Sequence, residues 1–316
     1  MQEFGSQVLK PRFDLLSLRK QSYDFFHFRA MNIILFSRKQ VKHNPEQLRT
    51  ILHEIERHNM DYVVNEDLAA VIESLTDIRI DASHLFSGKP QATGEDVMIT
   101  YGGDGTLLEG VALLPAQNIP VVGINCGRLG YLTADDGEGI EELFSAIAER
   151  RLRYEERLML TTEGMPQECL ALNEICIHRY GASMISVETL INDNYVATYH
   201  GDGLVVATPT GSTAYSLSAG GPIVDPMCRC FVLTPIAPHN LTMRPVVIPD
   251  SSIVTLRISS RGGEAQLSAD NHTYTLTDGA EVKVRLASKK VILAMPHNNT
   301  FYDTLREKMM WGIDKR

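Results

Sequence analysis

The residues with the clearest chemical meaning form the run Gly102-Gly103-Asp104-Gly105-Thr106. This run stands between an apolar strand pattern, Val97 to Tyr101, and a helical pattern, Leu107 to Leu114. Glycines at a strand-to-helix turn permit positive φ angles and close approach of a ligand to the backbone. The start of a helix also presents unpaired N–H groups to an anion. The run is therefore predicted to be a phosphate-binding turn.

Asp104 gives this turn a more specific chemistry. The turn is not a Walker loop, because no GxxxxGK[ST] sequence occurs, and Leu108 stands where the dinucleotide fingerprint has its third glycine. A carboxylate repels phosphates unless Mg²⁺ or a hydroxyl nucleophile lies between them, which points to phosphoryl transfer. The alternative is that Asp104 only caps the helix and the glycines only make a tight turn.

A second feature is the pair Asn173-Glu174 within the apolar segment Leu170 to Ile177. Alternation along a strand would put these two polar side chains on opposite faces. The pattern predicts that the end of the strand opens onto a polar cleft. An edge strand with both groups in water is the alternative.

A third feature is the turn Gly201-Asp202-Gly203 and the later run Thr208 to Pro222, which contains six serine and threonine residues. Such a run is too polar to be core and is predicted to form a tight loop, whose hydroxyl and N–H groups suit a sugar or a planar base. Its length and the aromatic Tyr215 make a simple linker a poor explanation.

The elements that must position these residues fall into two classes. Up to about Arg150, apolar strands alternate with amphipathic helices, which predicts a parallel, Rossmann-like open sheet. After Arg150 the segments are short, β-rich and separated by turns, which predicts an all-β domain, and a last helix is expected from Thr300 to Trp311. The expected strands of the first part are Ile33 to Ser37, Tyr62 to Asn65, Asp96 to Thr100 and Pro120 to Asn125, with helices over Glu46 to His58 and Ile140 to Arg150.

The expected domain organisation has four parts. Residues 1–30 lack a clean period and end before Met31, so we expect a flexible extension there. Residues 31–150 are expected to form the α/β domain, residues 151–290 the β-rich domain, and residues 291–316 a C-terminal segment with a helix.

Composition narrows the class of protein. The chain has 316 residues, with 30 basic and 39 acidic side chains and a net charge of -9, which disfavours nucleic acid as the main partner. We see no transmembrane stretch and no signal peptide, and expect a cytoplasmic protein without a membrane partner. The five cysteines lack a CxxC spacing and are expected to be reduced core residues.

In their order and spacing, these motifs resemble the NAD kinase family from Met31 to Trp311. The matching segments are GGDGT, the asparagine-glutamate pair, the run from Thr208 to Ile223, Gly123 to Asn125 with Gly127 to Leu132, Leu241 to Pro245, and Phe301 to Arg306. Diacylglycerol and sphingosine kinases share GGDGT alone. A lipid kinase, which would need an apolar acyl-chain site, and a non-catalytic nucleotide sensor therefore remain as alternatives.

The resemblance implies that ATP phosphorylates the adenosine-ribose 2′-hydroxyl of NAD with the help of a divalent metal, for which Mg²⁺ is expected. It also implies that the protein is a homodimer or homotetramer. The ligands of the metal remain unassigned. The resemblance also implies a two-domain fold whose C-terminal helix returns to the first domain. Asp104 would orient and deprotonate the hydroxyl, and ATP phosphates would lie against Gly102, Gly103, Gly105 and Thr106. The positions that correspond to dinucleotide contacts are Asn173, Glu174, Asp202, Thr213, Ala214, Tyr215 and Ser218.

One segment departs from the pattern of the family. Where the family usually has serine-x-aspartate-glycine, this chain has Ser268-Ala269-Asp270-Asn271, followed by His272. Asparagine tolerates positive φ better than most residues, so we expect Asn271 to preserve the turn. We also expect His272 to contact substrate, although a lone histidine in a β-turn is more often a solvated surface residue.

Overall fold

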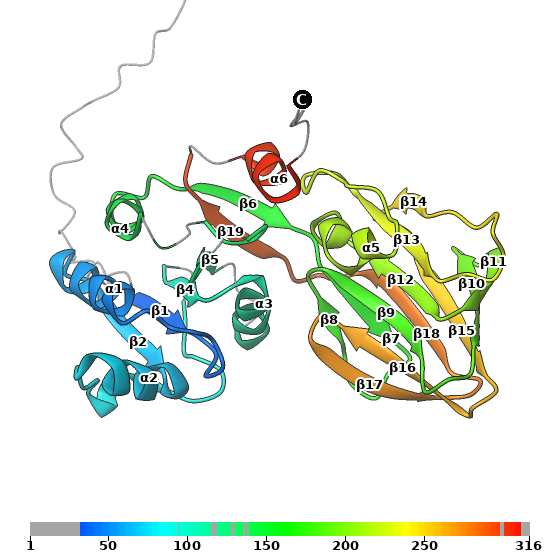
Figure 1. Cartoon of the computed structure of the whole chain (residues 1–316), viewed down its shortest axis with the longest axis horizontal. Coiled ribbons are helices and arrows are strands. Elements are labelled where there is room, and N and C mark those ends of the chain that lie inside the picture. The colour runs from blue at the N-terminus through cyan, green and yellow to red at the C-terminus, as the bar shows by residue number, and fades with distance from the viewer. Residues whose placement is uncertain are drawn as a thin grey trace, which may run out of the picture. The chain divides into compact units, whose positions relative to one another are not determined.

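The computed structural model describes residues 32–310, except 94, 115–118, 128–129, 135–136, 138 and 298–299 (Figure 1). The expectation for residues 1–30 therefore falls outside the described residues. None of the helices in the described part is long and apolar enough to cross a membrane.

The first part of the chain builds a seven-stranded sheet in the order β3-β2-β1-β4-β5-β19-β6. Neighbouring strands are parallel except for β6, which runs antiparallel to β19, so the Rossmann-like sheet is confirmed. The strands are β1 (Asn32–Phe36), β2 (Asp61–Asn65), β3 (Leu85–Phe86), β4 (Val97–Tyr101), β5 (Pro120–Ile124), β6 (Arg153–Arg157) and β19 (Val291–Met295). β6 was expected in the second domain, but its pairing with β19 makes it part of this sheet.

The sheet is completed by helices α1 (Pro45–Arg57), α2 (Glu66–Thr76), α3 (Asp104–Leu113) and α4 (Ile140–Ala148) and by the short turn η1 (Ala82–His84). In α1, the i, i+3, i+7 spacing of Leu48, Ile51 and Ile55 buries one face, and Asn44 caps the helix by accepting from Glu46 N. Helix α2 was not predicted from the sequence. Asn65 caps it by accepting a hydrogen bond from Leu68 N.

The second part of the chain forms two six-stranded sheets of antiparallel strands whose inner faces share one apolar core. One sheet has the order β11-β10-β15-β18-β7-β8 and the other the order β14-β13-β12-β9-β16-β17. The first consists of β7 (Leu160–Glu163), β8 (Leu170–Ala171), β10 (Ile185–Ile191), β11 (Asn194–Gly201), β15 (Val254–Ser260) and β18 (Glu281–Leu286). The second consists of β9 (Glu174–Arg179), β12 (Gly203–Ala207), β13 (Cys230–Ile236), β14 (Val246–Pro249), β16 (Glu264–Ala269) and β17 (His272–Thr277).

The predicted strand from Leu170 to Ile177 is broken in the structure. β8 ends at Ala171 in one sheet and β9 begins at Glu174 in the other, so Leu172 and Asn173 form the crossing between sheets. The carbonyls of these two residues accept hydrogen bonds from Thr208, through its Oγ1 at 2.6 Å and its N–H at 2.9 Å, instead of joining a ladder. The prediction of one continuous strand was wrong. The alternating pattern of apolar and polar residues continues across the break, so the sequence gives no sign of it.

The C-terminal helix α6 (Phe301–Met309) begins with a capping box between Thr300 and Asp303. Tyr302 OH donates to Asp225 Oδ2 at 2.7 Å, and Lys308 Nζ lies 5.2 Å from the centre of the Tyr131 ring. The helix therefore returns to the first domain through Tyr131, as the resemblance implied. It ends before Trp311, which lies outside the described residues.

Candidate active site

The glycine turn leaves β4 and enters α3 with a geometry that only glycine allows. Gly102 has φ +153° and its N–H donates to the Ile124 carbonyl at 2.8 Å. A methyl group on Gly102 would lie 2.4 Å from Thr106 Oγ1. The helix begins at Asp104, three residues earlier than predicted, with Gly103 at a cap position that supplies no side-chain acceptor. The first N–H groups of α3 are therefore available to an anion.

Asp104 is held by a loop that is distant in sequence. Its Oδ2 accepts from Tyr131 N at 2.9 Å, and its Oδ1 accepts from Leu132 N at 3.1 Å. A methyl group on Gly130 would lie 1.9 Å from Asp104 Oδ1, so the loop approaches this closely only because residue 130 is glycine. The carboxylate thus bonds N–H groups of another segment instead of those of its own helix, contrary to the simple capping alternative.

The other residues of the turn differ in their accessibility. Nothing lies within 4 Å of the place where a methyl group on Gly103 would be. The Thr106 side chain is only 1% exposed, and its Oγ1 is buried with no hydrogen-bond partner among the described groups. Its contact with ATP remains a prediction, since the buried hydroxyl would have to become accessible.

Arg38 is a candidate phosphate ligand that the sequence analysis missed. It follows β1, the neighbour of β4 in the sheet, and its Nη2 lies 3.4 Å from where a methyl group on Gly105 would be. Its Nε lies 3.7 Å from Glu109 Oε2, too far for a good hydrogen bond. Ligands of open α/β sheets bind at the carboxyl ends of strands, where the strand order reverses. Because Arg38 directly follows a buried strand, its position in the sequence was the available signal.

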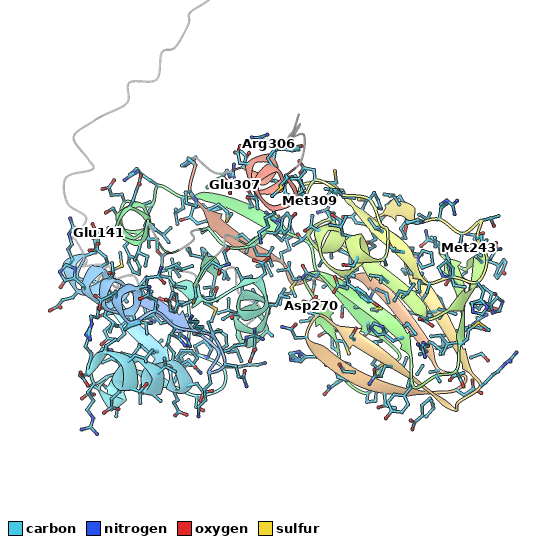
Figure 2. The ribbon with its side chains drawn as sticks, in the orientation of Figure 1. Glu141, Met243, Asp270, Arg306, Glu307 and Met309 are labelled. Carbon is cyan, nitrogen blue, oxygen red and sulfur yellow. The ribbon has the colours of Figure 1, made fainter. Side chains whose placement is uncertain are left out.

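The chain segment that crosses between the two β sheets is held by Asp270, which is labelled in Figure 2. Its carboxylate accepts from the N–H groups of Leu172 at 2.7 Å, Asn173 at 2.9 Å and Glu174 at 3.1 Å. Positive φ in this turn belongs to Asp270, at +46°, and not to Asn271. The turn between β16 and β17 is preserved as expected, but not through positive φ at Asn271, because the first central residue of this two-residue hairpin adopts the left-handed conformation.

Glu174 is a buried carboxyl group beside Asp270. Its Oε2 has no hydrogen-bond partner among the described residues. Burial and the nearby Asp270 charge raise the pKa of Glu174 to about 8, against the opposing effect of a hydrogen bond from Tyr215 N. Burial also raises the pKa of Asp270, but hydrogen bonds from three N–H groups oppose this and favour its anion, so Glu174 is the member of the pair that keeps its proton at neutral pH.

His178 is a second residue that the sequence analysis missed. Glu174, Cys176 and His178 alternate along β9, while Ile175 and Ile177 enter the sandwich core. The ring of His178 stacks on Tyr215 with 5.7 Å between centroids, and its Nε2 lies 3.0 Å from Ser268 Oγ. Burial lowers the pKa of His178. The period of two along β9 was the signal that could have indicated this residue.

The hydroxyl-rich run forms η2 (Thr210–Thr213) and α5 (Tyr215–Ser218), which contain or adjoin Thr213, Ala214, Tyr215 and Ser218. This run packs on Asn173: a methyl group on Gly211 would lie 2.0 Å from the Asn173 carbonyl oxygen. Thr213 Oγ1 donates to the Thr210 carbonyl, whereas Ser218 is exposed. The structure therefore brings the second and third sequence motifs together.

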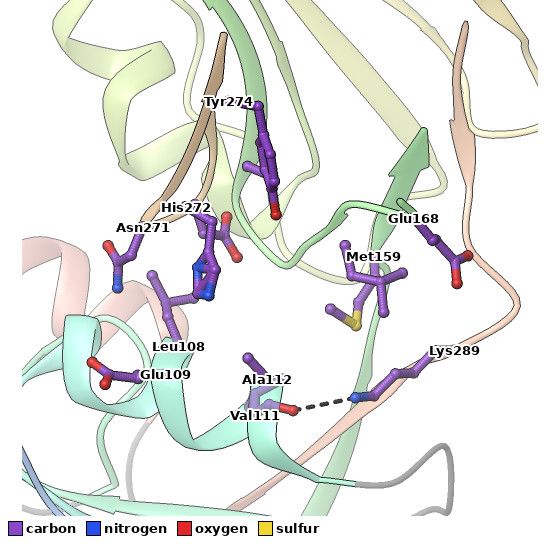
Figure 3. Close-up of a pocket in the computed structure, with 13 residues that line it drawn as sticks. Leu108, Glu109, Val111, Ala112, Met159, Glu168, Asn271, His272, Tyr274 and Lys289 are labelled. Atoms are coloured by element: carbon purple, nitrogen blue, oxygen red, sulfur yellow. Dashed lines mark hydrogen bonds between the residues drawn. The ribbon is translucent and has the colours of Figure 1, made fainter. Parts of the chain in front are cut away.

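Asp202 and His272 lie at other edges of this region. Asp202 follows β11 and pairs with Arg179 Nε at 2.7 Å, with a half-exposed side chain. His272 is exposed and lines a pocket of about 170 Å³ together with Leu108 and Glu109 of α3 and with Lys289 (Figure 3). Their contacts with a dinucleotide remain predictions.

The chain matches two family models: the ATP-NAD kinase N-terminal domain over residues 33–152 and the ATP-NAD kinase C-terminal domain over residues 172–295. Similar curated proteins are NAD kinases. That of Christiangramia forsetii is 37% identical over 84% of this chain and 93% of its own length. That of Bacteroides fragilis is 35% identical over 90% of this chain and 100% of its own length, and that of Porphyromonas gingivalis is 45% identical over 70% and 78%.

Two solved structures have the same fold. Yeast NADH kinase complexed with NADH superposes with a TM-score of 0.80 at 25% identity, covering 92% of this chain and 90% of the yeast chain. An NAD kinase from Archaeoglobus fulgidus in complex with ATP gives a TM-score of 0.68 at 24% identity, covering 89% and 98%, and supports the fold alone. The two-domain architecture, the motifs it brings together and the full-length relatives agree: the chain belongs to the ATP-NAD kinase family.

Proposed function

We propose that this chain transfers the γ-phosphoryl group of ATP to the 2′-hydroxyl of the adenosine ribose of NAD, which gives NADP and ADP. The observation that carries the proposal is the Asp104 carboxylate, held at the open N-terminus of α3 beside the glycine turn. A carboxylate at this position would be a proton acceptor beside N–H groups suited to phosphate, which supports the proposal. No comparison supports the lipid kinase alternative.

In this reaction the ribose oxygen forms a bond to Pγ as the bond from Pγ to the β,γ-bridging oxygen breaks, and ADP leaves with the electron pair. Asp104 orients the hydroxyl and accepts its proton, then releases the proton to water. A loose transition state requires little proton removal early, so positioning by Asp104 contributes more than its basicity.

The donor phosphates would lie against Gly102, Gly103 and Gly105, with Arg38 as a further cation. Mg²⁺ usually binds through one or two carboxylates together with substrate phosphates. The Asp104 carboxylate, which lies at the start of α3 beside the glycine turn, suits that mode. When bound, the metal would neutralise charge on the transferring phosphoryl group.

The dinucleotide would occupy the surface formed by Asn173, Glu174, the η2–α5 run, Asp202 and His272. The aromatic face of Tyr215, stacked on His178, suits a planar base. The protonated Glu174 can donate a hydrogen bond to a sugar or phosphate oxygen.

Assembly and location are further proposals. Apolar side chains are exposed on the edge strands of the β domain and in the loop before β14, where Leu241 is 85% exposed. We expect a homodimer or homotetramer that covers such residues, and light scattering on the purified protein would measure its mass. We also expect the protein to act in the cytoplasm.

The deciding experiment incubates the purified protein with NAD, ATP and Mg²⁺ and measures NADP with an NADP-specific dehydrogenase. NAD that lacks the adenosine 2′-hydroxyl should bind with a modest penalty and give no phosphorylated product. A phosphorylated product from this analogue would refute the assignment of the nucleophile. Formation of ADP with a sphingoid base, and none with NAD, would favour the lipid kinase alternative.

A further inference from the structure

We infer that Asn271 is a positioning residue for phosphoryl transfer, because its side chain ties the NAD-binding domain to the first turn of α3. The inference rests on the proposed function and concerns a residue to which neither the motifs nor the family resemblance gives a role. Asn271 Nδ2 donates to the Gly105 carbonyl oxygen at 3.2 Å, across 166 residues of sequence.

Asp270 and Asn271 form the two-residue turn between β16 and β17, with Ala269 and His272 paired on either side. The Asp270 side chain accepts N–H groups from the crossing at Leu172 and Asn173. Asn271, the next residue, donates instead to the phosphate-facing turn. One short, hydrogen-bonded turn therefore contacts both the acceptor side and the donor side of the site.

The packing around this hydrogen bond makes it important. Behind the turn, the pocket of about 170 Å³ separates the side of α3 from the hairpin, and Figure 3 shows Asn271 and His272 beside Leu108 and Glu109 at one end of it. Because space for water interrupts the packing here, the local connection depends on the Asn271 hydrogen bond more than on apolar contact.

The residue type is also informative. A glycine at position 271 could make no side-chain hydrogen bond. This chain does not need glycine there, because the positive φ angle is carried by Asp270. An asparagine at 271 thus adds a hydrogen bond to Gly105 without straining the turn.

The hydrogen bond from Asn271 to Gly105, called the tie below, is expected to affect the rate of phosphoryl transfer more than the affinity for either substrate. Transfer requires the ribose oxygen and Pγ to be about 3–3.5 Å apart and in line, and small displacements in such a geometry reduce the rate strongly. Loss of the tie lets the GGDGT turn move relative to the bound dinucleotide, while each substrate keeps its own contacts. The expected effect is a lower kcat with little change in the KM for NAD.

The test compares Asn271→Ala and Asn271→Asp with the wild type and with Asn194→Ala. Asn194 is a matched control, since its Nδ2 donates to the Asn192 carbonyl at 2.9 Å within its own hairpin. We expect kcat to fall about five-fold in Asn271→Ala, the scale of one net hydrogen bond. Asn271→Asp should fall further, because a carboxylate oxygen would face the Gly105 carbonyl. Asn271→Gln, which retains the donor, should recover part of the loss, and Asn194→Ala should keep its kcat.

A second readout does not depend on activity. Amide hydrogen exchange at residues 103–108 should be faster in Asn271→Ala than in the wild type or in Asn194→Ala. Wild-type kcat and wild-type exchange in both Asn271→Ala and Asn271→Asp would overturn the inference. So would a raised KM for NAD at unchanged kcat, which would make Asn271 a substrate contact. Absence of NADP formation by the wild type would refute the proposed function, whereas the exchange measurement would still decide whether the tie exists.

Discussion

Replacing Glu174 with glutamine should change how the stability of the protein depends on pH. In the folded chain the pKa of Glu174 is raised from 4.5 to about 8. Between these values the folded state keeps a proton that the unfolded chain has lost, so this residue makes the free energy of unfolding fall as pH rises. The fall is about 1.4 kcal/mol for each pH unit, and therefore at most roughly 4 kcal/mol from pH 5 to pH 8.

Glutamine has the shape of the protonated acid and does not titrate, so the free energy of unfolding of Glu174→Gln lacks this fall with pH. Urea denaturation without NAD at pH 5, 6.5, 8 and 9 would give the free energy of unfolding of both proteins. The advantage of Glu174→Gln over the wild type should be smallest at pH 5, grow up to about pH 8 and then level off. Glu264→Gln, which changes an exposed carboxylate on β16, is the control for a general charge effect. Parallel curves for Glu174→Gln and the wild type would refute the reasoning.

Three further substitutions test the catalytic side of the site. Asp104→Asn should lower kcat by about 10² or more. It should also cost about 1 kcal/mol of stability, since its amide nitrogen would face the N–H of Tyr131 or Leu132. Steady-state kinetics and a melting curve measure the two effects, and a near-normal kcat would contradict the proposed role. Gly130→Ala should displace the Asp104 carboxylate and lower kcat by a similar factor of about 10², whereas normal turnover would mean that the contact is not needed. Arg38→Gln should raise the KM for ATP about ten-fold and leave the KM for NAD unchanged. Initial rates at varied ATP concentration measure this, and an unchanged KM for ATP would show that Arg38 does not bind ATP.

The local features of the site could be predicted from the sequence. A glycine-rich turn after an apolar strand indicates an open helix N-terminus, and the structure places Asp104 there. The alternating pattern around Asn173 indicated β structure but could not reveal that the chain changes sheets at that point. That change depends on hydrogen bonds from Thr208, which no local pattern records.

Other features depend on contacts between distant residues. The partners of Asp104 lie 27 and 28 residues along the chain, and Asp270 binds N–H groups 96 to 98 residues away. Propensity and periodicity describe neighbours in sequence, so they could not indicate these pairs. His178 was within reach of sequence reasoning, because its period of two with Glu174 was present.

The position of β19 has a consequence for how the protein is made. This strand fills the place between β5 and β6 in the first sheet, yet it follows the whole β domain in the sequence and leaves the ribosome after it. Until it emerges, the edge of β5 has unpaired N–H and C=O groups, which are prone to join a strand of another chain. We therefore expect premature termination before Val291 to yield an aggregating fragment rather than a folded first domain. Completion of this sheet should therefore wait until the β domain has been synthesised.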